Sequence, residues 1–548
     1  MAQVLEYTVG ELLEKTAEAY PKTEGMVYRD LGLRQTYAEF NQATDELAKS
    51  FIGLGVEKGE HVAIWAANKP EWLLSQFATA KAGAVLVTVN TNYRSAELAY
   101  VLQQSDASTL ILQKSLKDVS YLEELQKILP ELQTSDPGKI KSERFPHLKR
   151  VIFIDEEGEP GTFSWSEFEA KKDEVSDAKL HERKASLDAD EVINMQYTSG
   201  TTGFPKGVML THRNIVNNAS NIGDCMNLRA GDRLCIPVPF FHCFGCVLGT
   251  LACVTKGATM IPLETFDPEA VLETVEAEQC TALHGVPTMF ISELNHPSFD
   301  AYHLSSLRTG IMAGSNCPEE VMKAVIEKMG AAEITIAYGQ TEASPVITQT
   351  RVDDAFHRRV ETVGRALPEV EVKIADRHTG EPLPPGEQGE LCTRGYHVMK
   401  GYYKNEEATS AVLSEDGWLH TGDLAVMDED GYCRITGRLK DMIIRGGENI
   451  YPREIEEFLY THPKVLDVQV VGVPDETYGE EVSAWVQLKE GETATVDELK
   501  AYCRDHISKF KVPRYIAFVS EYPMTASGKV QKFKLREQAE EAFRNVEI

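Results

Sequence analysis

The segment that most constrains the fold is a loop rich in glycine and hydroxyl side chains, Tyr197-Thr-Ser-Gly-Thr-Thr-Gly-Phe-Pro-Lys-Gly207. It lies between a strand-like run, residues 192–197, and a helix-like run that starts at Thr211. Glycines let backbone N–H groups approach an anion closely, and successive N–H groups form an anion-binding nest. The hydroxyl groups of Ser199, Thr201 and Thr202 and the Lys206 ammonium add donors. The pattern predicts a phosphate-binding loop in an α/β fold.

Two other interpretations of this loop are weaker. The Walker A loop of nucleotide hydrolases follows the pattern GxxxxGK[ST], in which the lysine comes directly after a glycine. Here Lys206 follows Pro205 and precedes Gly207, so the pattern does not fit. A flexible surface loop is the ordinary alternative for such a composition, and the flanking strand and helix signals disfavour it.

The first 150 residues alternate strand and helix signals. Apolar residues recur at helical spacing over Tyr37–Gly53, a short strand pattern follows at His61–Trp65, and a helix is predicted over Pro70–Ala82. Continuous apolar runs, typical of buried parallel strands, occur at residues 84–89, 110–112 and 151–154. Strands joined by helices predict an α/β fold. The polar, proline-containing stretch Lys114–Arg150 predicts a surface helix and loop without chemistry.

A chain of 548 residues exceeds what one hydrophobic core usually serves, so at least two domains are expected. The pattern changes near Gly437, after which the signals predict a compact α+β unit. Its predicted elements are a helix at 452–460, strands at 465–473 and 483–488, a helix at 496–507 and a strand at 515–520. We place the boundary at Arg438–Asp441, between an N-terminal domain of packed α/β sheets (1–437) and a C-terminal domain (438–548).

Charge and cysteine usage limit the partners. The formal net charge is -29, which disfavours nucleic acid and anionic membranes as partners. Ten scattered cysteines do not form a disulfide scaffold, and a reducing, cytoplasmic location is the simplest interpretation. Cys243 and Cys246 form a single CxxC pair, for which pocket lining is a better interpretation than metal or redox chemistry. No signal-peptide pattern and no apolar run long enough for a transmembrane helix is present in the sequence.

Five motifs occur in order along the chain, and together they resemble those of the adenylate-forming superfamily of acyl-CoA synthetases, adenylation domains and beetle luciferases. They are Tyr197–Gly207, Ala337-Tyr-Gly-Gln-Thr-Glu342, Gly417-Trp-Leu-His-Thr-Gly-Asp423, Gly437-Arg-Leu-Lys-Asp441 and Pro523-Met-Thr-Ala-Ser-Gly-Lys529. The resemblance covers essentially the whole chain. Through Arg445–Pro452 the chain is most similar to bacterial medium- to long-chain fatty acyl-CoA synthetases and their mitochondrial relatives.

The resemblance implies an ATP-dependent acid–thiol ligase. It would activate a hydrophobic carboxylate, most simply a medium- to long-chain fatty acid, to acyl-AMP with release of pyrophosphate, and then transfer the acyl group to coenzyme A. ATP, Mg²⁺ and coenzyme A are the expected cofactors and co-substrates, and a homodimer is possible. An aryl-CoA ligase of the coumarate type and a free-standing enzyme that loads a carrier protein remain alternatives. A non-catalytic acyl or nucleotide sensor is disfavoured, because such a protein would not need all five charged motif residues. These are Lys206, Glu342, Asp423, Arg438 and Lys529.

The resemblance also implies roles for residues. The expected catalytic residues are Lys206, His242, Thr341, Glu342 and Lys529, and Glu342 would hold the metal ion. Tyr338 would stack on adenine, and Asp423 would accept hydrogen bonds from ribose hydroxyls. The nucleotide site is expected to comprise Thr198, Ser199, Gly200, Thr201, Thr202, Gly203, Lys206, Gly314, Ser315, Tyr338, Gly339, Thr341, Asp423, Arg438 and Lys529.

The C-terminal domain is implied to be mobile. Lys440 would be its hinge, and Lys529 would be carried into the site to bridge the carboxylate and the α-phosphate. After rotation, Arg445, Gly446, Gly447 and Glu448 would line the coenzyme A channel. The apolar side chains expected in the acyl pocket, with His242 as a gate, are Phe240, Phe241, His242, Val286, Phe290, Ile311, Met312 and Val346. No lysine or arginine in this set would meet a second carboxylate, so a monocarboxylic acid is favoured.

Overall fold

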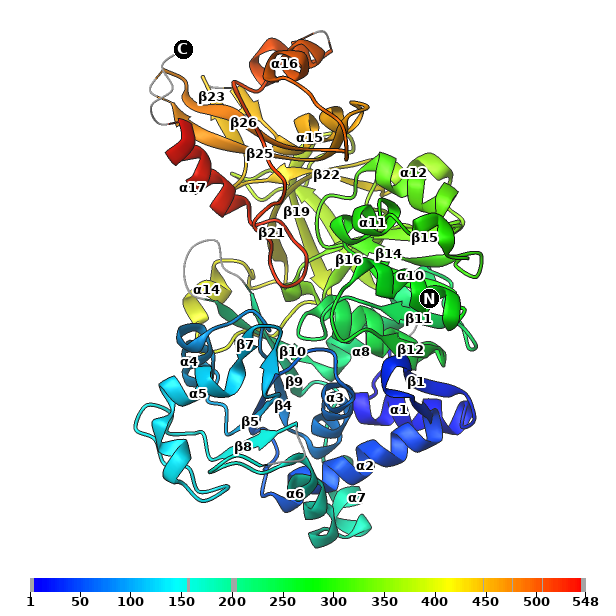
Figure 1. Ribbon diagram of the computed structural model, residues 1–548, viewed down its shortest axis with the longest axis vertical. Coiled ribbons are helices and arrows are strands. Elements are labelled where there is room, and N and C mark those ends of the chain that lie inside the picture. Colours follow the sequence, from blue (N-terminus) through cyan, green and yellow to red (C-terminus); the bar gives the residue numbers. More distant parts are fainter. Residues whose placement is uncertain are drawn as a thin grey trace.

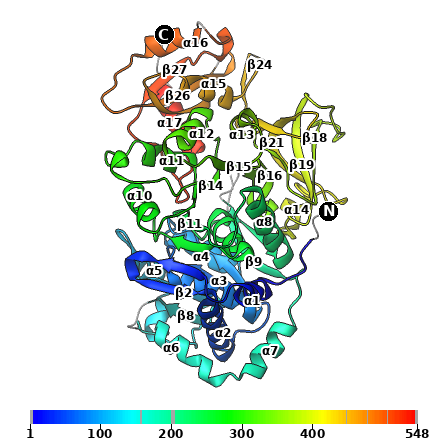
Figure 2. The ribbon, with the colours of Figure 1, turned by 90° about the vertical axis from the view of Figure 1, so that its right-hand side faces the viewer.

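The structure is a computed structural model that describes residues 4–154, 158–198, 205–446, 448–475, 477–504 and 506–543. Figure 1 shows a large body with a smaller lobe above it, and the smaller lobe contains the segments coloured orange and red. The 90° turn in Figure 2 shows the same division, with the lobe resting on the upper end of the body. The fold class predicted from the sequence, a large α/β part with a smaller α+β part, is confirmed.

One sheet of the body contains the strands predicted from the N-terminal sequence. Its strand order is β20-β10-β9-β4-β3-β5-β8. These strands are β3 (His61–Trp65), β4 (Val85–Thr88), β5 (Thr109–Leu112), β8 (Arg150–Phe153), β9 (Val192–Thr198), β10 (Lys206–Thr211) and β20 (Gly401–Tyr402). Strands β9, β4, β3, β5 and β8 are parallel, whereas β10 is antiparallel to both β9 and β20. The parallel strands are apolar on both faces because helices cover the sheet.

A second, larger sheet of the body has the order β17-β16-β15-β14-β13-β11-β12-β1-β2. Its strands are β1 (Glu24–Tyr28), β2 (Leu33–Thr36), β11 (Arg233–Ile236), β12 (Thr259–Pro262), β13 (Ala282–Gly285), β14 (Thr309–Ala313), β15 (Glu333–Gly339), β16 (Val346–Gln349) and β17 (Arg365–Ala366). Strands β1, β12, β11, β13, β14 and β15 are parallel in this sheet. The carboxyl ends of β14 and β15 carry the predicted nucleotide residues, in accordance with the ligand position usual for open α/β sheets.

Helices pack between and around these two sheets (Figures 1 and 2). In the body they are α1 (Val9–Ala19), α2 (Tyr37–Gly53), α3 (Pro70–Ala82), α4 (Ser95–Gln104), α5 (Tyr121–Ile128), α6 (Trp165–Glu169), α7 (Asp177–Ala185), α8 (His212–Cys225), α9 (Ala252–Lys256), α10 (Pro268–Ala277), α11 (Pro287–Leu294), α12 (Glu319–Lys328), α13 (Phe356–Glu361) and α14 (Glu406–Ser410). A π-helix at Phe244–Leu251 precedes α9. The predicted helices at Tyr37–Gly53 and Pro70–Ala82 are α2 and α3.

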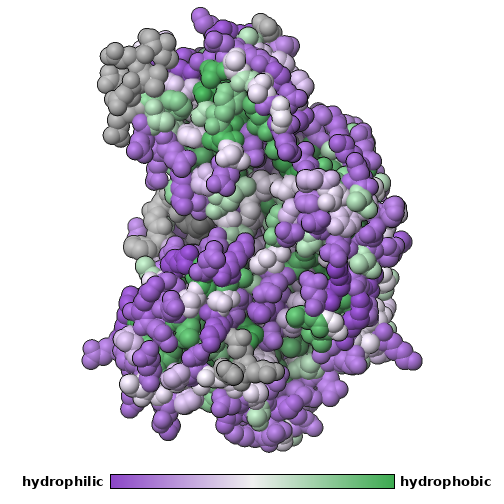
Figure 3. Space-filling model, in the orientation of Figure 1, coloured by the Kyte–Doolittle hydropathy of each residue, from purple (hydrophilic) through white to green (hydrophobic). Residues whose placement is uncertain are grey.

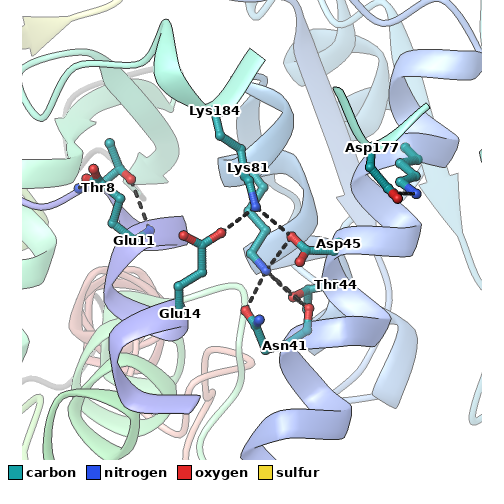
Figure 4. Close-up of polar contacts among 10 residues, drawn as sticks. Thr8, Glu11, Glu14, Asn41, Thr44, Asp45, Lys81, Asp177 and Lys184 are labelled. Carbon is teal, nitrogen blue, oxygen red and sulfur yellow. Dashed lines mark hydrogen bonds and ion pairs between the residues drawn. The ribbon is translucent and has the colours of Figure 1, made fainter. Parts of the chain in front are cut away.

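A buried lysine joins the N-terminal helices (Figure 4). The side chain of Lys81, on α3, is fully buried, and its Nζ donates to Asn41 Oδ1 at 2.7 Å, Thr44 Oγ1 at 2.9 Å and Asp45 Oδ1 at 2.9 Å. Lys184 of α7 also pairs with Asp45, at 3.2 Å. A buried charge is tolerated only where it is paired and hydrogen-bonded, so this cluster fixes how α2, α3 and α7 pack together.

A third, antiparallel sheet connects the body to the lobe. It consists of β18 (Val370–Ala375), β19 (Gln388–Gly395), β21 (Leu419–Met427) and β22 (Cys433–Arg438), in that order. In the predicted hinge segment, residues 438–441, Arg438 is the last residue of β22 and the next three residues form a turn, in which Lys440 is exposed. The domain boundary and the hinge role stay predictions.

The lobe has its own sheet and its own hydrophobic clusters. The sheet contains β23 (Ile443–Arg445), β24 (Glu448–Ile450), β25 (Val465–Asp475), β26 (Gly479–Leu488) and β27 (Tyr515–Phe518), and the helices are α15 (Pro452–Tyr460), α16 (Val496–Arg504) and α17 (Lys532–Phe543). The predicted elements correspond to α15, β25, β26, α16 and β27. The sequence patterns missed β23, β24 and α17, of which the two strands are only three residues long.

The helix predicted from Thr211 is α8, and Thr211 is its N-cap. The sequence patterns missed the strand before it, β10, of which Lys206 is the first residue. The expectation of a surface helix and loop over Lys114–Arg150 was wrong in one respect, because part of this stretch is buried. Tyr121 stacks on Trp65 with ring centroids 3.8 Å apart, and apolar side chains of the loop, including Phe145, are buried in a second core cluster. Sparse apolar residues in a polar stretch carry no periodic signal.

The visible surface is mainly hydrophilic, with a green apolar area over the lobe (Figure 3). Exposed apolar side chains of the lobe include Ile444, Tyr478, Phe518 and Phe533. Within the residues that the structure describes, no helix combines the length and the apolar character needed to cross a membrane.

Candidate active site

A buried carboxylate lies where the third sheet meets the end of β15. Asp423 is 3% exposed and faces Arg438 across the β21–β22 pair. Its Oδ2 accepts a hydrogen bond from the Tyr338 hydroxyl at 2.7 Å, and its Oδ1 accepts one from Arg438 Nε at 2.9 Å. The negative charge of Asp423 raises the pKa of Arg438. Three residues that the sequence predicted for the nucleotide site are therefore in direct contact.

An irregularity in the sheet positions the side chain of Asp423. The register between β19 and β21 shifts between Glu390 and Cys392, opposite the segment that contains Gly422, whose φ is +72°. Such bulges redirect side chains and occur often beside active sites. Glu390 Oε1 accepts a hydrogen bond from the Gly422 N–H at 3.0 Å and thereby holds this turn. Sequence reasoning missed Glu390, since its role depends on a strand 30 residues away.

A second carboxylate, Glu342, lies beside the beginning of β10. Glu342 belongs to a short 3₁₀ turn, Thr341–Ala343, and its Oε1 accepts a hydrogen bond from the Tyr402 hydroxyl at 2.7 Å. The Lys206 ammonium lies over the Tyr402 ring, 4.3 Å from the centroid. Tyr402 therefore links the predicted metal ligand to the predicted phosphate-binding lysine. The sequence offered no signal for Tyr402, because β20 joins β10 only in the folded sheet.

Close backbone packing precedes this turn. A Cβ atom on Gly339 would lie 1.8 Å from the Pro345 carbonyl oxygen, so only glycine fits at the end of β15. This contact positions the turn that carries Thr341 and Glu342. Sequence reasoning had placed Gly339 in the nucleotide site, and the structure gives it a steric reason to be glycine.

Lys529 extends from the lobe into the body. Thr288 of α11 donates a hydrogen bond from Oγ1 to the Gly528 carbonyl at 2.8 Å, and this contact holds the Lys529 loop against the body. At Gly314, which has φ +96°, an added Cβ would meet Lys529 Cε at 3.1 Å. Burial and the nearby Arg438 lower the pKa of the Lys529 ammonium to about 8. The structure thus brings Lys529 to the predicted nucleotide residues Gly314 and Arg438.

His242 lies close enough to Lys529 for their charges to interact. Burial and the Lys529 ammonium lower the pKa of His242 to about 3, so the imidazole is neutral. Its Nδ1 accepts a hydrogen bond from the Phe244 N–H at 3.1 Å, which assigns the proton to Nε2. With its acceptor nitrogen occupied, His242 is poorly suited to act as a general base.

The CxxC pair next to His242 is fully buried. Cys243 donates to Gln196 Oε1 at 2.9 Å, and Gln196 Nε2 donates to Cys246 Sγ at 3.1 Å. Burial raises the pKa of both thiols, that of Cys246 to about 12. Such thiols are unreactive, because the thiolate is the reactive species. The pair therefore contributes packing at the start of the π-helix.

The predicted acyl-pocket residues are buried, apart from the partly exposed His242. Val286 lies against both Gly314 and Gly528, so it is next to the Lys529 loop, and Phe290 packs on Gly285. The Phe240 ring instead packs on Trp72 of α3, with centroids 5.2 Å apart. Six of the eight belong to the main hydrophobic cluster of the body, and they are Phe240, Val286, Phe290, Ile311, Met312 and Val346.

The residues expected in the coenzyme A channel lie elsewhere in this structure. Arg445 pairs with the buried carboxylate of Glu481 through two hydrogen bonds, of 2.7 and 2.9 Å, and stacks over the Tyr478 ring. Gly446 has φ +59°, and Glu448 is exposed. These contacts of Arg445 are with other residues of the lobe.

Some predicted residues lie outside the described part of the chain, namely Ser199, Gly200, Thr201, Thr202, Gly203 and Gly447. Thr198 is the last residue of β9, and Ser315 is exposed after the end of β14. The remaining residues provide a consistent ligand chemistry. The Glu342 carboxylate is a hard oxygen ligand of the kind Mg²⁺ requires, and Lys206, Arg438 and Lys529 supply the positive charge that a polyphosphate requires.

Comparison with known proteins agrees with this geometry. Residues 13–403 match the family described as AMP-binding enzyme, and residues 454–529 match the AMP-binding enzyme C-terminal domain. YngI of Bacillus subtilis (strain 168), which is named as an acyl-CoA synthetase, is 64% identical over 543 residues, which are 99% of each chain. The mitochondrial medium-chain acyl-CoA ligase ACSF2 of Danio rerio is 46% identical over 97% of this chain and 88% of its own.

A solved structure is also similar over nearly the full length. The anthranilate CoA ligase AuaEII, in complex with anthranoyl-AMP, superposes with a TM-score of 0.87 at 27% identity and covers 98% of both chains. That complex holds an acyl-adenylate, the type of intermediate for which the carboxylates and cations described above are suited.

Proposed function

The chain belongs to the AMP-binding enzyme family of adenylate-forming enzymes, and from that premise we propose that it converts a medium- to long-chain fatty acid, through acyl-AMP, to acyl-CoA. It is an acyl-CoA synthetase by its relatives and fold. The observation that carries the finer proposal is the approach of Lys529 from the lobe to Gly314 and Arg438 in the body.

The first half-reaction joins two anions. A carboxylate oxygen attacks the α-phosphorus of ATP, an oxygen–phosphorus bond forms, and the bond to the β-phosphate breaks as pyrophosphate leaves. The Lys529 ammonium offsets the repulsion by contacting both the carboxylate and the α-phosphate, and it stabilises the charge that develops in the transition state. Its position at Gly314, next to the apolar side chain of Val286, supports this role.

The nucleotide is held by side chains of the body. Asp423 accepts hydrogen bonds from the ribose hydroxyls, and Arg438 and Lys206 interact with phosphate or ribose oxygens. Tyr402 orients the Glu342 carboxylate through its 2.7 Å hydrogen bond. Mg²⁺, when bound by Glu342, would neutralise phosphate charge, and the chain's own contribution is to hold that carboxylate in place.

The second half-reaction requires a different surface of the lobe. The lobe rotates about Lys440 once pyrophosphate has left, and Arg445, Gly446, Gly447 and Glu448 then line the channel for coenzyme A. The thiol sulfur bonds to the acyl carbon, the bond from that carbon to the phosphate oxygen of AMP breaks, and the thiol proton is released to solvent as AMP leaves. The neutral imidazole of His242 lines the junction of the acyl and coenzyme channels. It does not act as a base toward the thiol, because its acceptor nitrogen is occupied by the Phe244 N–H.

The substrate is a hydrophobic monocarboxylic acid. The side chains of Val286, Phe290, Ile311 and Met312 are buried and apolar, which favours an alkyl chain. The relative named as a medium-chain acyl-CoA ligase supports the same class of acid.

The test is pyrophosphate release by the full chain with fatty, aryl and amino acids, each with and without coenzyme A. Fatty acids should give pyrophosphate and AMP, and the acyl-CoA thioester should form only when coenzyme A is added. Preference for an aryl acid would replace the fatty-acid assignment with an aryl-CoA ligase. Turnover with a carrier protein but not with coenzyme A would show that the acyl acceptor is a carrier protein. Formation of ADP in place of AMP would refute adenylation.

A further inference from the structure

Three side chains with different metal-ligating atoms converge on one face of the β19–β21 pair. Cys392 and His420 are direct cross-strand partners, and Glu390 lies two residues before Cys392, on the same face of β19. One ligand atom from each lies within 4.8 Å of the others. We propose that Glu390, Cys392 and His420 form a binding site for Zn²⁺, behind the turn that carries Asp423.

The distances suit a tetrahedral ion. His420 Nδ1 lies 3.5 Å from Cys392 Sγ and 3.0 Å from Glu390 Oε2. Zinc bonds of about 2.0–2.3 Å at tetrahedral angles place neighbouring ligand atoms roughly 3.3–3.6 Å apart. These two distances are close to that spacing, and the ligand atoms of Glu390 and Cys392 lie within 4.8 Å of each other, so rotations of the side chains would bring all three to one ion.

The ligand types select the ion. A thiolate, an imidazole and a carboxylate are a set that Zn²⁺ accepts, whereas Mg²⁺ and Ca²⁺ prefer oxygen ligands alone. Binding replaces the Cys392 S–H bond with an S–Zn bond and releases one proton to solvent, without oxidation or reduction. His420 is partly exposed at 36%, which leaves room for water as the fourth ligand.

The position of the site couples it to the nucleotide turn. Glu390 Oε2 faces His420, while Glu390 Oε1 accepts the hydrogen bond from the Gly422 N–H at 3.0 Å. A metal ion on Oε2 leaves that second bond intact, so it would fix the carboxylate that holds the turn before Asp423. The proposal does not depend on which acid the enzyme activates.

Cobalt(II) provides a spectroscopic probe, because thiolate coordination gives a charge-transfer absorption in the near ultraviolet. The full untagged chain, first treated with a chelator, is titrated with Co²⁺ and then with Zn²⁺. We expect one equivalent of Co²⁺ with the thiolate band, loss of the band on addition of Zn²⁺, and a higher melting temperature with Zn²⁺. Cys392→Ser should abolish the band and the thermal shift, and His420→Ala should weaken Co²⁺ binding at least tenfold.

Cys433→Ser is the matched control, because Cys433 is buried in the adjacent strand β22, where its thiol donates to the Gly431 carbonyl and not to Glu390 or His420. This variant should bind Co²⁺ like the wild type. If Cys392→Ser does not fold, His420→Ala tests the site independently. A wild type without a thiolate band, or a band that persists in both site variants, would overturn the proposal.

Discussion

The ammonium of Lys529 experiences two effects that act in the same direction. Burial and the Arg438 guanidinium both favour the neutral amine and lower the pKa to about 8. The proposed role requires the protonated form, which predominates below that pKa and is lost as the pH rises through it. The kcat/KM of adenylate formation, which reports pKa values of the free enzyme, should therefore fall as the pH rises above about 8.

Lys529→Arg should remove this falling limb, although with a lower rate, because arginine stays charged at these pH values but differs in shape. Exposed Lys534, five residues further along, provides the control, and Lys534→Arg should keep the wild-type profile. Pyrophosphate release measured between pH 6.5 and 9.5 checks this, and a flat wild-type profile would contradict the assignment.

Removal of the Lys529 charge should separate the two half-reactions. We expect Lys529→Ala to lower adenylate formation by about 10²–10³-fold, the effect typical of losing one group that stabilises developing charge. The reaction of preformed acyl-AMP with coenzyme A should change by only a few fold. Single-turnover assays of each half-reaction measure this, with Lys534→Ala as control. Equal losses in both halves would show that Lys529 is not specific to adenylation.

Tyr402 should act through the metal ligand. Tyr402→Phe removes the hydroxyl that binds Glu342 and keeps the ring beneath Lys206, so the Mg²⁺ concentration for half-maximal activity should rise about tenfold. The neighbouring Tyr403 binds Asp106 instead, and Tyr403→Phe is the control. An unchanged Mg²⁺ dependence in Tyr402→Phe would show that Tyr402 does not act through the metal ligand Glu342.

At the scale of helices, the stability of the N-terminal part should depend on the buried pair between α2 and α3. Asp45→Ala would leave the fully buried Lys81 ammonium without its carboxylate, which should lower the free energy of unfolding by about 3 kcal/mol. Asp177, 93% exposed in its pair with Lys49, offers a comparison, and Asp177→Ala should cause no measurable change. Chemical denaturation measures both, and equal stabilities would contradict this role for Lys81.

Elements were predictable where their pattern was periodic or continuous. Helices α2 and α3 and strand β3 follow from the spacing of apolar residues, because the buried face of an element must be apolar. Strand β10 was missed because the loop before it and the helix after it dominate the local signal. The buried part of Lys114–Arg150 was missed because single apolar residues in irregular structure have no period.

At the scale of the whole molecule, the proposed rotation requires the lobe to release the body between the two half-reactions. Asn316 of the body donates a hydrogen bond to Glu457 of α15 at 2.9 Å, so cysteines at these positions would lie close enough for a short bis-thiosulfonate cross-linker. The ten native cysteines are all buried and should react slowly. The cross-linked Asn316→Cys/Glu457→Cys enzyme should form acyl-AMP and lose at least tenfold in the thioester step.

Cleavage of the cross-link with a reductant should restore thioester formation. The single variant Asn316→Cys, treated with the same reagent, controls for modification alone. Undiminished thioester formation in the fully cross-linked enzyme would refute rotation of the lobe as a requirement for the second half-reaction.

The sequence by itself predicted the α/β fold and the change of architecture near Gly437, because these depend on residue types at short spacing. It indicated the reaction class through the resemblance of its five motifs to those of the adenylate-forming superfamily. It also pointed to Asp423, Arg438 and Lys529 separately. Only the tertiary structure decided that Tyr402 holds Glu342, that Glu390 supports the turn before Asp423, and that Lys529 reaches Gly314. Such contacts join residues from 32 to more than 200 positions apart, and their formation depends on how strands pair and how the lobe packs on the body.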